Sequence, residues 1–191
     1  MGGIRVIAGD LRGRVIPFSN RKFDDADITP QKVKKALFSM IGERLGETSF
    51  LDLFAGSGQI GIEAMSRGAR PTVINESDPR RHRFISTWIK GLDLDVPPLV
   101  LNMTAEGAMA YLADRGFRFD HIFLDPPYDR SDAAAAGYRD LIVAIARHGL
   151  AVPGGSIIVQ HFSGNRLVKE IPSFSLRSTK GYGNTSLSRY S

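Results

Sequence analysis

Residues 125–130, DPPYDR, place a carboxylate, two prolines and an aromatic ring directly after the apolar run 119–124. Proline donates no backbone hydrogen bond, so it ends a strand. The pattern predicts that Asp125 and Tyr128 lie at the carboxyl end of a buried strand, where open α/β sheets bind ligands. Asp125 and the Pro126 carbonyl could accept hydrogen bonds from the exocyclic amine of a nucleobase, and Tyr128 could stack on that base. The alternative is a simple strand-ending turn.

A glycine-rich segment suggests a second half of the same site. Residues 52–64, DLFAGSGQIGIEA, run from a predicted strand into a helix, and Gly56, Gly58 and Gly61 fit the pattern G-x-G-x-x-G. Such glycines let a ligand approach the backbone and the helix N-terminus, although tight turns also use them for structure alone. Glu76 follows 18 residues after Gly58 and could accept both hydroxyls of a ribose.

Two nucleoside cofactors fit a glycine turn followed by an acid: a dinucleotide and S-adenosylmethionine. The carboxylate of Asp52, just before the glycines, would repel an anionic pyrophosphate but could hold a cationic amine. This favours the methyl donor. The P-loop pattern GxxxxGK[ST] is absent from the sequence, which argues against a nucleotide hydrolase.

The composition and the charge distribution limit the remaining possibilities. The 191 residues carry a net charge of +5 and no cysteine, and 42% of them are hydrophobic. No apolar run approaches the roughly 20 residues of a membrane helix, and the four histidines lack ligand spacing, so we expect a cytoplasmic, metal-free protein. Both ends of the chain are basic, which suggests a polyanionic partner, although a solvated basic surface is the alternative. The candidate RNA contacts are Arg12, Arg14, Lys32, Lys34 and Lys35.

Hydrophobic periodicity predicts the elements that would position these residues. A hairpin over 4–17 and a helix that starts with Thr29 as N-cap and ends at Gly46 form a basic extension, residues 1–46. Alternating strands and helices in 47–163 predict a mostly parallel sheet, and three further strands follow. The strands are expected at 49–54, 71–76, 97–102, 121–125 and 156–162, and the helices at 58–67, 79–91, 104–115 and 132–148.

Several segments together resemble the RsmD family, whose members methylate guanine N2 in bacterial 16S rRNA. They are IRVIAGDLRGR, TPQKVKKALF, LDLFAGSGQIGIEAMSRGA, NESD, DPPY and GYGNTSLSRY, and they span nearly the whole chain. The resemblance implies an α/β, Rossmann-like class I methyltransferase domain over 47–191, with a seven-stranded sheet whose last strand is antiparallel. It also implies S-adenosylmethionine as cofactor and 16S rRNA or a small-subunit assembly intermediate as partner. We expect the protein to be a monomer.

The same resemblance implies a role for each site residue. Asp52, Gly56 and Gly58 would line the methionine side of the cofactor, Glu76 the ribose, and Thr104 and Ala105 the adenine. Phe54 is a further expected cofactor contact. Asp125, Pro126 and Tyr128 would hold the target base. The sequence departs from the family pattern twice: Asp27 stands where members commonly have arginine, and Thr104-Ala105 replace the usual adenine-side acid.

Two other functions remain open on the residues alone. One keeps the amine methylation but takes a DNA base or a protein glutamine as acceptor; Asp125 argues mildly against the glutamine enzymes, which usually carry asparagine there. The other is a non-catalytic RNA-binding protein on a methyltransferase fold. Binding of the methyl donor would separate this last possibility from an enzyme.

Overall fold

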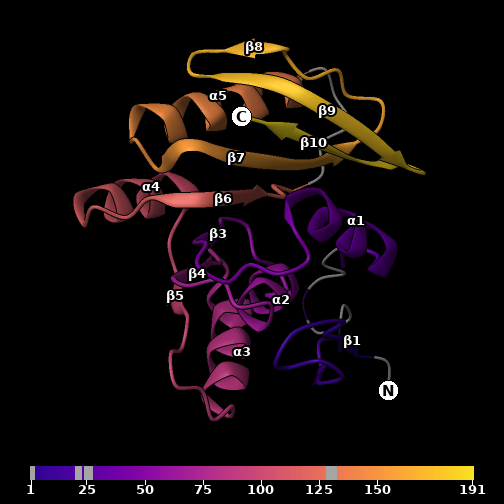
Figure 1. Cartoon of the computed structure of the whole chain (residues 1–191), viewed down its shortest axis with the longest axis vertical. Coiled ribbons are helices and arrows are strands. Elements are labelled where there is room, and N and C mark those ends of the chain that lie inside the picture. The colour runs from indigo at the N-terminus through magenta and orange to yellow at the C-terminus, as the bar shows by residue number, and fades with distance from the viewer. Residues whose placement is uncertain (1–2, 20–22, 24–27, 128–132) are drawn as a thin grey trace.

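The chain folds around one large sheet, shown in Figure 1. The structure is a computed structural model, and it describes residues 3–19, 23, 28–127 and 133–191. The strands are β1 (Ile4–Arg5), β2 (Val15–Ile16), β3 (Phe50–Asp52), β4 (Thr72–Asn75), β5 (Leu99–Leu101), β6 (Phe119–Leu124), β7 (Ala151–Phe162), β8 (Glu170–Ile171), β9 (Phe174–Tyr182) and β10 (Thr185–Tyr190). The helices are α1 (Gln31–Ile41), α2 (Gln59–Ser66), α3 (Pro79–Lys90), α4 (Ala105–Asp114) and α5 (Ala133–Arg147).

The strand order of the main sheet is β5-β4-β3-β6-β7-β10-β9-β8. The strands from β5 to β7 are parallel, and β10 is antiparallel to both of its neighbours, β7 and β9. The predicted seven-stranded arrangement with an antiparallel last strand is therefore confirmed. The described residues add an eighth strand, β8, which has two residues and pairs only with β9 at the edge.

Both faces of the central strands are buried, as a parallel sheet with helices on each side requires. Alternate residues of β3 enter different hydrophobic clusters: Leu51 packs with α4 and α5, whereas Phe50 packs with α1 and α2. In β7, Val159 and Ile158 divide in the same way. Every residue of α2 is buried, because this helix lies between the sheet and the N-terminal segment. The sheet is thus fixed from two sides and can hold its strand ends in a constant position.

The N-terminal segment forms the predicted hairpin, but α1 differs from its prediction at both ends. The helix ends at Ile41 and not at Gly46, because Gly42 adopts a φ of 118°, which no helix residue can have. Thr29 is not the N-cap, since the helix begins one residue later, after Pro30, with no side-chain cap. Hydrophobic residues of the hairpin share a cluster with α2 and α3. The division of the chain at residue 46 stays a prediction.

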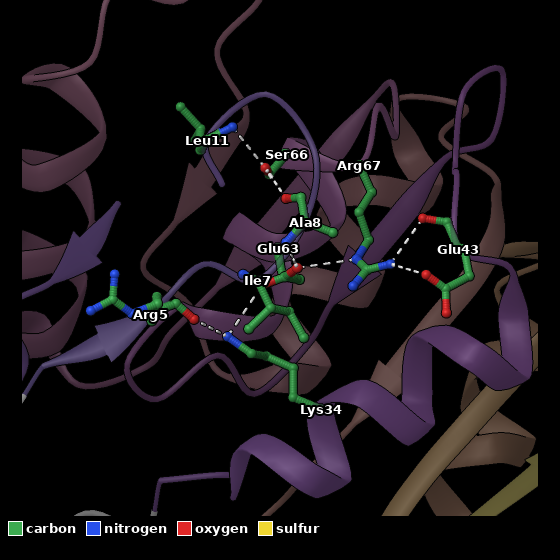
Figure 2. A network of polar contacts seen from close by, with 9 residues as sticks. All are labelled: Arg5, Ile7, Ala8, Leu11, Lys34, Glu43, Glu63, Ser66 and Arg67. Atoms are coloured by element: carbon green, nitrogen blue, oxygen red, sulfur yellow. Dashed lines mark hydrogen bonds and ion pairs between the residues drawn. The ribbon is translucent and has the colours of Figure 1, made fainter. Parts of the chain in front are cut away.

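A buried carboxylate fixes the N-terminal segment to α2, as Figure 2 shows. Glu63 of α2 is fully buried and accepts hydrogen bonds from the backbone N–H groups of Ile7 and Ala8, each at 2.9 Å. Its oxygens also lie 3.2 Å from the Lys34 Nζ and 3.1 Å from the Arg67 Nε. Removing one partner of such a buried network leaves an uncompensated charge, which typically costs about 3–5 kcal/mol. No helix in the described part of the chain is both long enough and apolar enough to cross a membrane.

Candidate functional site

A cavity of about 450 Å³ lies at the carboxyl ends of the parallel strands. Its position is the one that open α/β sheets use for ligands. The structure brings together on its wall most of the residues that the sequence singled out, from four different strand ends. These are Asp52, Phe54, Gly56, Glu76, Thr104, Ala105, Asp125 and Pro126.

The glycine turn between β3 and α2 explains why this wall is open. Gly56 has a φ of 55°, and a Cβ placed on it would meet no atom within 4 Å, so a ligand can approach its backbone. Gly58 (φ 77°) is different: it is buried, it does not line the cavity, and a Cβ there would lie 3.0 Å from Ile85. Gly61 lets α2 pack on β4, since a Cβ would come within 2.6 Å of Ile74. Of the three glycines, only Gly56 faces the cavity directly.

Asp52 ends β3 beneath this turn and is completely buried. Its Oδ2 accepts a hydrogen bond of 2.9 Å from the backbone N–H of Gly61, whereas its Oδ1 has no hydrogen-bond partner among the described residues. Burial raises the pKa of this carboxyl to about 7. A buried acceptor without a partner, on the wall of a cavity, is the environment that a ligand ammonium group would complete.

Glu76 follows β4 and stabilises the glycine turn from the other side. Its Oε2 accepts a hydrogen bond of 2.6 Å from the Gly56 N–H, and its Oε1 accepts one of 2.8 Å from the Asp78 N–H. The side chain is therefore held against the cavity wall by two backbone donors. Each carboxylate oxygen can accept a second hydrogen bond, so Glu76 can still receive ligand hydroxyl groups.

The predicted adenine side lies at the start of α4. Thr104 is the N-cap of this helix and accepts a hydrogen bond of 3.1 Å from the Gly107 N–H, while Ala105 begins the first turn. Both residues line the cavity. The wall also includes Asn75 and Arg81, which sequence reasoning missed. Asn75 donates to the carbonyls of Leu53 and Met103 and so joins three strand ends, a role that no short motif encodes.

Asp125 follows β6, and two side chains from distant parts of the chain orient its carboxylate. The Gln160 Nε2 donates to the Asp125 Oδ2 at 2.8 Å, and the Thr29 hydroxyl donates to the same oxygen at 3.4 Å. Gln160 is 4% exposed, and Thr29 is also buried. Neither residue was among the predicted site residues. Tyr128 and Asp27 lie outside the described residues, so the predicted stacking role of Tyr128 stays a prediction.

The five predicted RNA contacts differ in their exposure to solvent. Arg12, Arg14, Lys32 and Lys35 are exposed. Lys34 is 1% exposed, and its Nζ donates to the Arg5 carbonyl at 2.8 Å in addition to its ion pair with Glu63. The assignment of Lys34 to RNA contact is wrong, because this ammonium lies inside the protein and cannot reach a phosphate. The spacing already contained the signal, since position 34 lies three and four residues before the buried Leu37 and Phe38.

Comparison with known proteins shows which proteins the chain resembles. The family model described as "Conserved hypothetical protein 95" matches residues 4–191. "Putative rRNA methyltransferase YlbH" of Bacillus subtilis (strain 168) is 32% identical over 98% of both chains. "Ribosomal RNA small subunit methyltransferase D" of Escherichia coli (strain K12) is 31% identical over 68% of this chain and 62% of its own length. The solved structure of yhhF from Escherichia coli superposes with a TM-score of 0.80 at 28% identity, covering 99% of this chain and 97% of that one.

The fold and the cavity define the class of protein first: a Rossmann-like methyltransferase, of the kind that uses S-adenosylmethionine. Within that class, the chain belongs to the RsmD-like family, whose model spans all but its first three residues.

Proposed function

We propose that the protein transfers a methyl group from S-adenosylmethionine to the exocyclic N2 amine of a guanine in bacterial 16S rRNA. The observation that carries the proposal is that the buried Asp52 and the oriented Asp125 line the same cavity. One carboxylate suits a cationic amine, and the other suits the N–H group of an acceptor. The relatives named as rRNA methyltransferases support RNA as the substrate class.

The part of the cavity between Asp52 and Ala105, which we call the cofactor half, has polar atoms that match those of S-adenosylmethionine. The unpartnered Oδ1 of Asp52 can accept from the α-amino group, and Glu76 can accept from the ribose hydroxyls. Gly56 leaves its side of the cavity open, and Thr104 and Ala105 would contact the adenine. When bound, S-adenosylmethionine supplies a methyl group on a positively charged sulfur.

The acceptor half addresses the poor nucleophilicity of an aromatic amine. The lone pair of such a nitrogen is delocalised into the base. A hydrogen bond from the amine to the Asp125 carboxylate strengthens as the nitrogen gains positive charge, so it stabilises the transition state more than the ground state. The Pro126 carbonyl is the second candidate acceptor, and Tyr128 is the proposed surface on which the extruded base stacks.

The RNA itself is proposed to contact the exposed cations of the N-terminal segment and α1. Arg12 and Arg14 lie in and beside the N-terminal hairpin turn, and Lys32 and Lys35 lie on α1. We propose that the protein acts in the cytoplasm as a monomer, on 16S rRNA or on a partly assembled small subunit.

The deciding experiment uses small ribosomal subunits that lack the methyl group. The protein is incubated with these subunits and labelled S-adenosylmethionine, and the RNA is then digested to nucleosides. We expect label in N2-methylguanosine only. Label in another nucleoside would show that guanine N2 is not the methyl acceptor. Methylation of DNA or of a protein glutamine in its place would show that the substrate class is wrong. Binding of S-adenosylmethionine without methyl transfer would show that the protein is a non-catalytic binding protein.

A further inference from the structure

A second concave surface of about 510 Å³ lies beside α1 and shares no wall residue with the cofactor cavity. Its wall combines one face of α1, the N-terminal segment near Ile7 and the end of β9. We call it the α1–β9 groove. The residues that matter for its chemistry are Lys32, Lys35, Glu43, Arg67 and Lys180.

The groove carries four cationic side chains and one carboxylate. Arg67 is already paired, with Glu63 at 3.1 Å and with Glu43 at 3.6 Å. Lys32, Lys35 and Lys180 form no ion pair within the described ranges of the chain, and all three are exposed. The one carboxylate of the groove, Glu43, pairs with Arg67, so the charges of the three lysines remain unpaired in the concavity and favour an anionic partner.

Both walls of the groove are connected to the acceptor end of the cavity. Thr29, two residues before α1, donates to Asp125. On the other wall, Lys180 pairs with Leu187, Leu187 pairs with Gln160, and Gln160 donates to Asp125. Two strand spacings place the backbone of Lys180 about 10 Å from that of Gln160. Figure 1 shows α1 beside the end of β9 and the start of β10, and Arg189 of β10 donates to the Met40 carbonyl of α1.

We propose that the α1–β9 groove binds the phosphodiester backbone of the RNA next to the target nucleotide. The inference rests on the proposed function and names where its substrate is held. Lys32 and Lys35 on one side and Lys180 on the other, from segments nearly 150 residues apart, contact successive phosphates. Because phosphate contacts fix register without reading sequence, the groove positions the strand while the cavity selects the base.

The test replaces Lys32, Lys35 and Lys180 by glutamine in one variant. Its matched control replaces three exposed cations that line neither concavity, Lys90, Arg147 and Lys169, and so removes the same charge. Affinity for undermethylated small subunits is measured as a function of salt concentration. Each lost phosphate contact should reduce the slope of log affinity against log salt by about 0.7–0.9, so we expect a total reduction of about two to three and RNA binding about tenfold weaker or more at low salt.

The control variant should keep the wild-type slope, and both variants should keep the wild-type affinity for S-adenosylmethionine. A groove variant whose slope equals that of the wild type or of the control overturns the proposal. Failure of the proposed function looks different: the wild-type protein then methylates no guanine N2 at all. Lys180→Gln alone should reduce the slope by about 0.7–0.9, and an unchanged slope removes Lys180 from the contact set.

Discussion

The two carboxylates of the cavity are held in opposite ways. Asp52 is completely buried, receives a backbone N–H only nine residues further along the chain, and has one oxygen without a partner. Asp125 is half-buried and receives side chains that are 35 and 96 residues away. The cofactor half is therefore built by local backbone geometry, whereas the acceptor half depends on distant parts of the fold meeting correctly. Substitutions in the cofactor half should therefore lower the affinity for S-adenosylmethionine, whereas substitutions in the acceptor half should lower the rate of methyl transfer.

Asp125→Asn should have the largest effect. The amide keeps the size of the side chain and one acceptor oxygen but loses the charge that stabilises a nitrogen gaining positive character. We expect kcat to fall by about 10²-fold or more, while the affinity for S-adenosylmethionine changes little. Single-turnover rates with saturating donor on undermethylated subunits measure the effect. A variant that methylates at the wild-type rate would reduce Asp125 to part of a strand-ending turn.

Asp52→Asn should mainly lower the affinity for S-adenosylmethionine and have less effect on the rate. The amide can still accept from the Gly61 N–H but places no negative charge against the ligand amine. We expect donor binding to weaken by about 1.5–3 kcal/mol, as for a hydrogen bond to a charged group, with a smaller effect on the rate at saturation.

The pH dependence of S-adenosylmethionine binding tests whether the charge of Asp52 is what holds the donor. Because burial raises its pKa to about 7, the carboxyl of the free protein is neutral below that pH and must lose a proton before it can pair with an ammonium. Donor affinity should therefore rise as pH increases through about 7, and it should fall again near pH 8, where an α-amino group loses its proton. Calorimetric titration should find no rising limb in Asp52→Asn; the same limb in the variant would assign the titration to another group.

Glu76→Ala tests whether the cofactor half depends on the ligand alone or also on the turn. We expect binding to weaken by about 1–3 kcal/mol, because the ribose loses a charged acceptor and the Gly56 N–H loses its partner. Glu76→Gln is the matched variant, since its one oxygen can still accept from Gly56. If both variants bind the donor equally well, the hydrogen bond from the Gly56 N–H to Glu76 does not contribute to donor binding. NAD should not bind to the wild-type protein, and tight NAD binding would overturn the cofactor assignment.

The contrast between the halves also explains what could be predicted from the sequence. Glycine spacing, a strand-ending proline and an acid after the next strand are local patterns, so they located Asp52, Gly56, Glu76 and Asp125 on one cavity. Thr29 was predicted as a helix cap because it precedes Pro30 and a helical pattern. Its contact with Asp125 spans 96 residues, which no local pattern reveals. Gln160 lies within an ordinary strand, and only the register of β6 against β7 brings it to Asp125.

Gln160→Leu should lower the rate of methyl transfer although Gln160 itself is not proposed to contact the substrate. Leucine keeps the bulk of the buried side chain but removes the 2.8 Å hydrogen bond to Oδ2, so the carboxylate of Asp125 loses its shortest side-chain donor among those described above. We expect kcat to fall by about tenfold, as for a hydrogen bond to a charged group, with donor affinity unchanged. Gln160→Glu distinguishes orientation from packing: a second carboxylate would face Asp125, and its effect should exceed that of leucine if Asp125 reacts as an anion.

Thr29→Val should have the smallest effect on the rate of methyl transfer. Valine has the shape of threonine, so the buried packing beside α1 is kept and only the hydroxyl is lost. The bond to Asp125 is long, 3.4 Å, and therefore weak, so we place its contribution at the low end of the range for protein hydrogen bonds, about 0.5 kcal/mol. We therefore expect kcat to fall about twofold, and the double variant with Gln160→Leu to lose more than the product of the single effects, because Oδ2 then has neither donor. Single-turnover rates of the wild type, both single variants and the double variant complete the cycle. Rates that simply multiply would show that Thr29 and Gln160 act on Asp125 independently of each other.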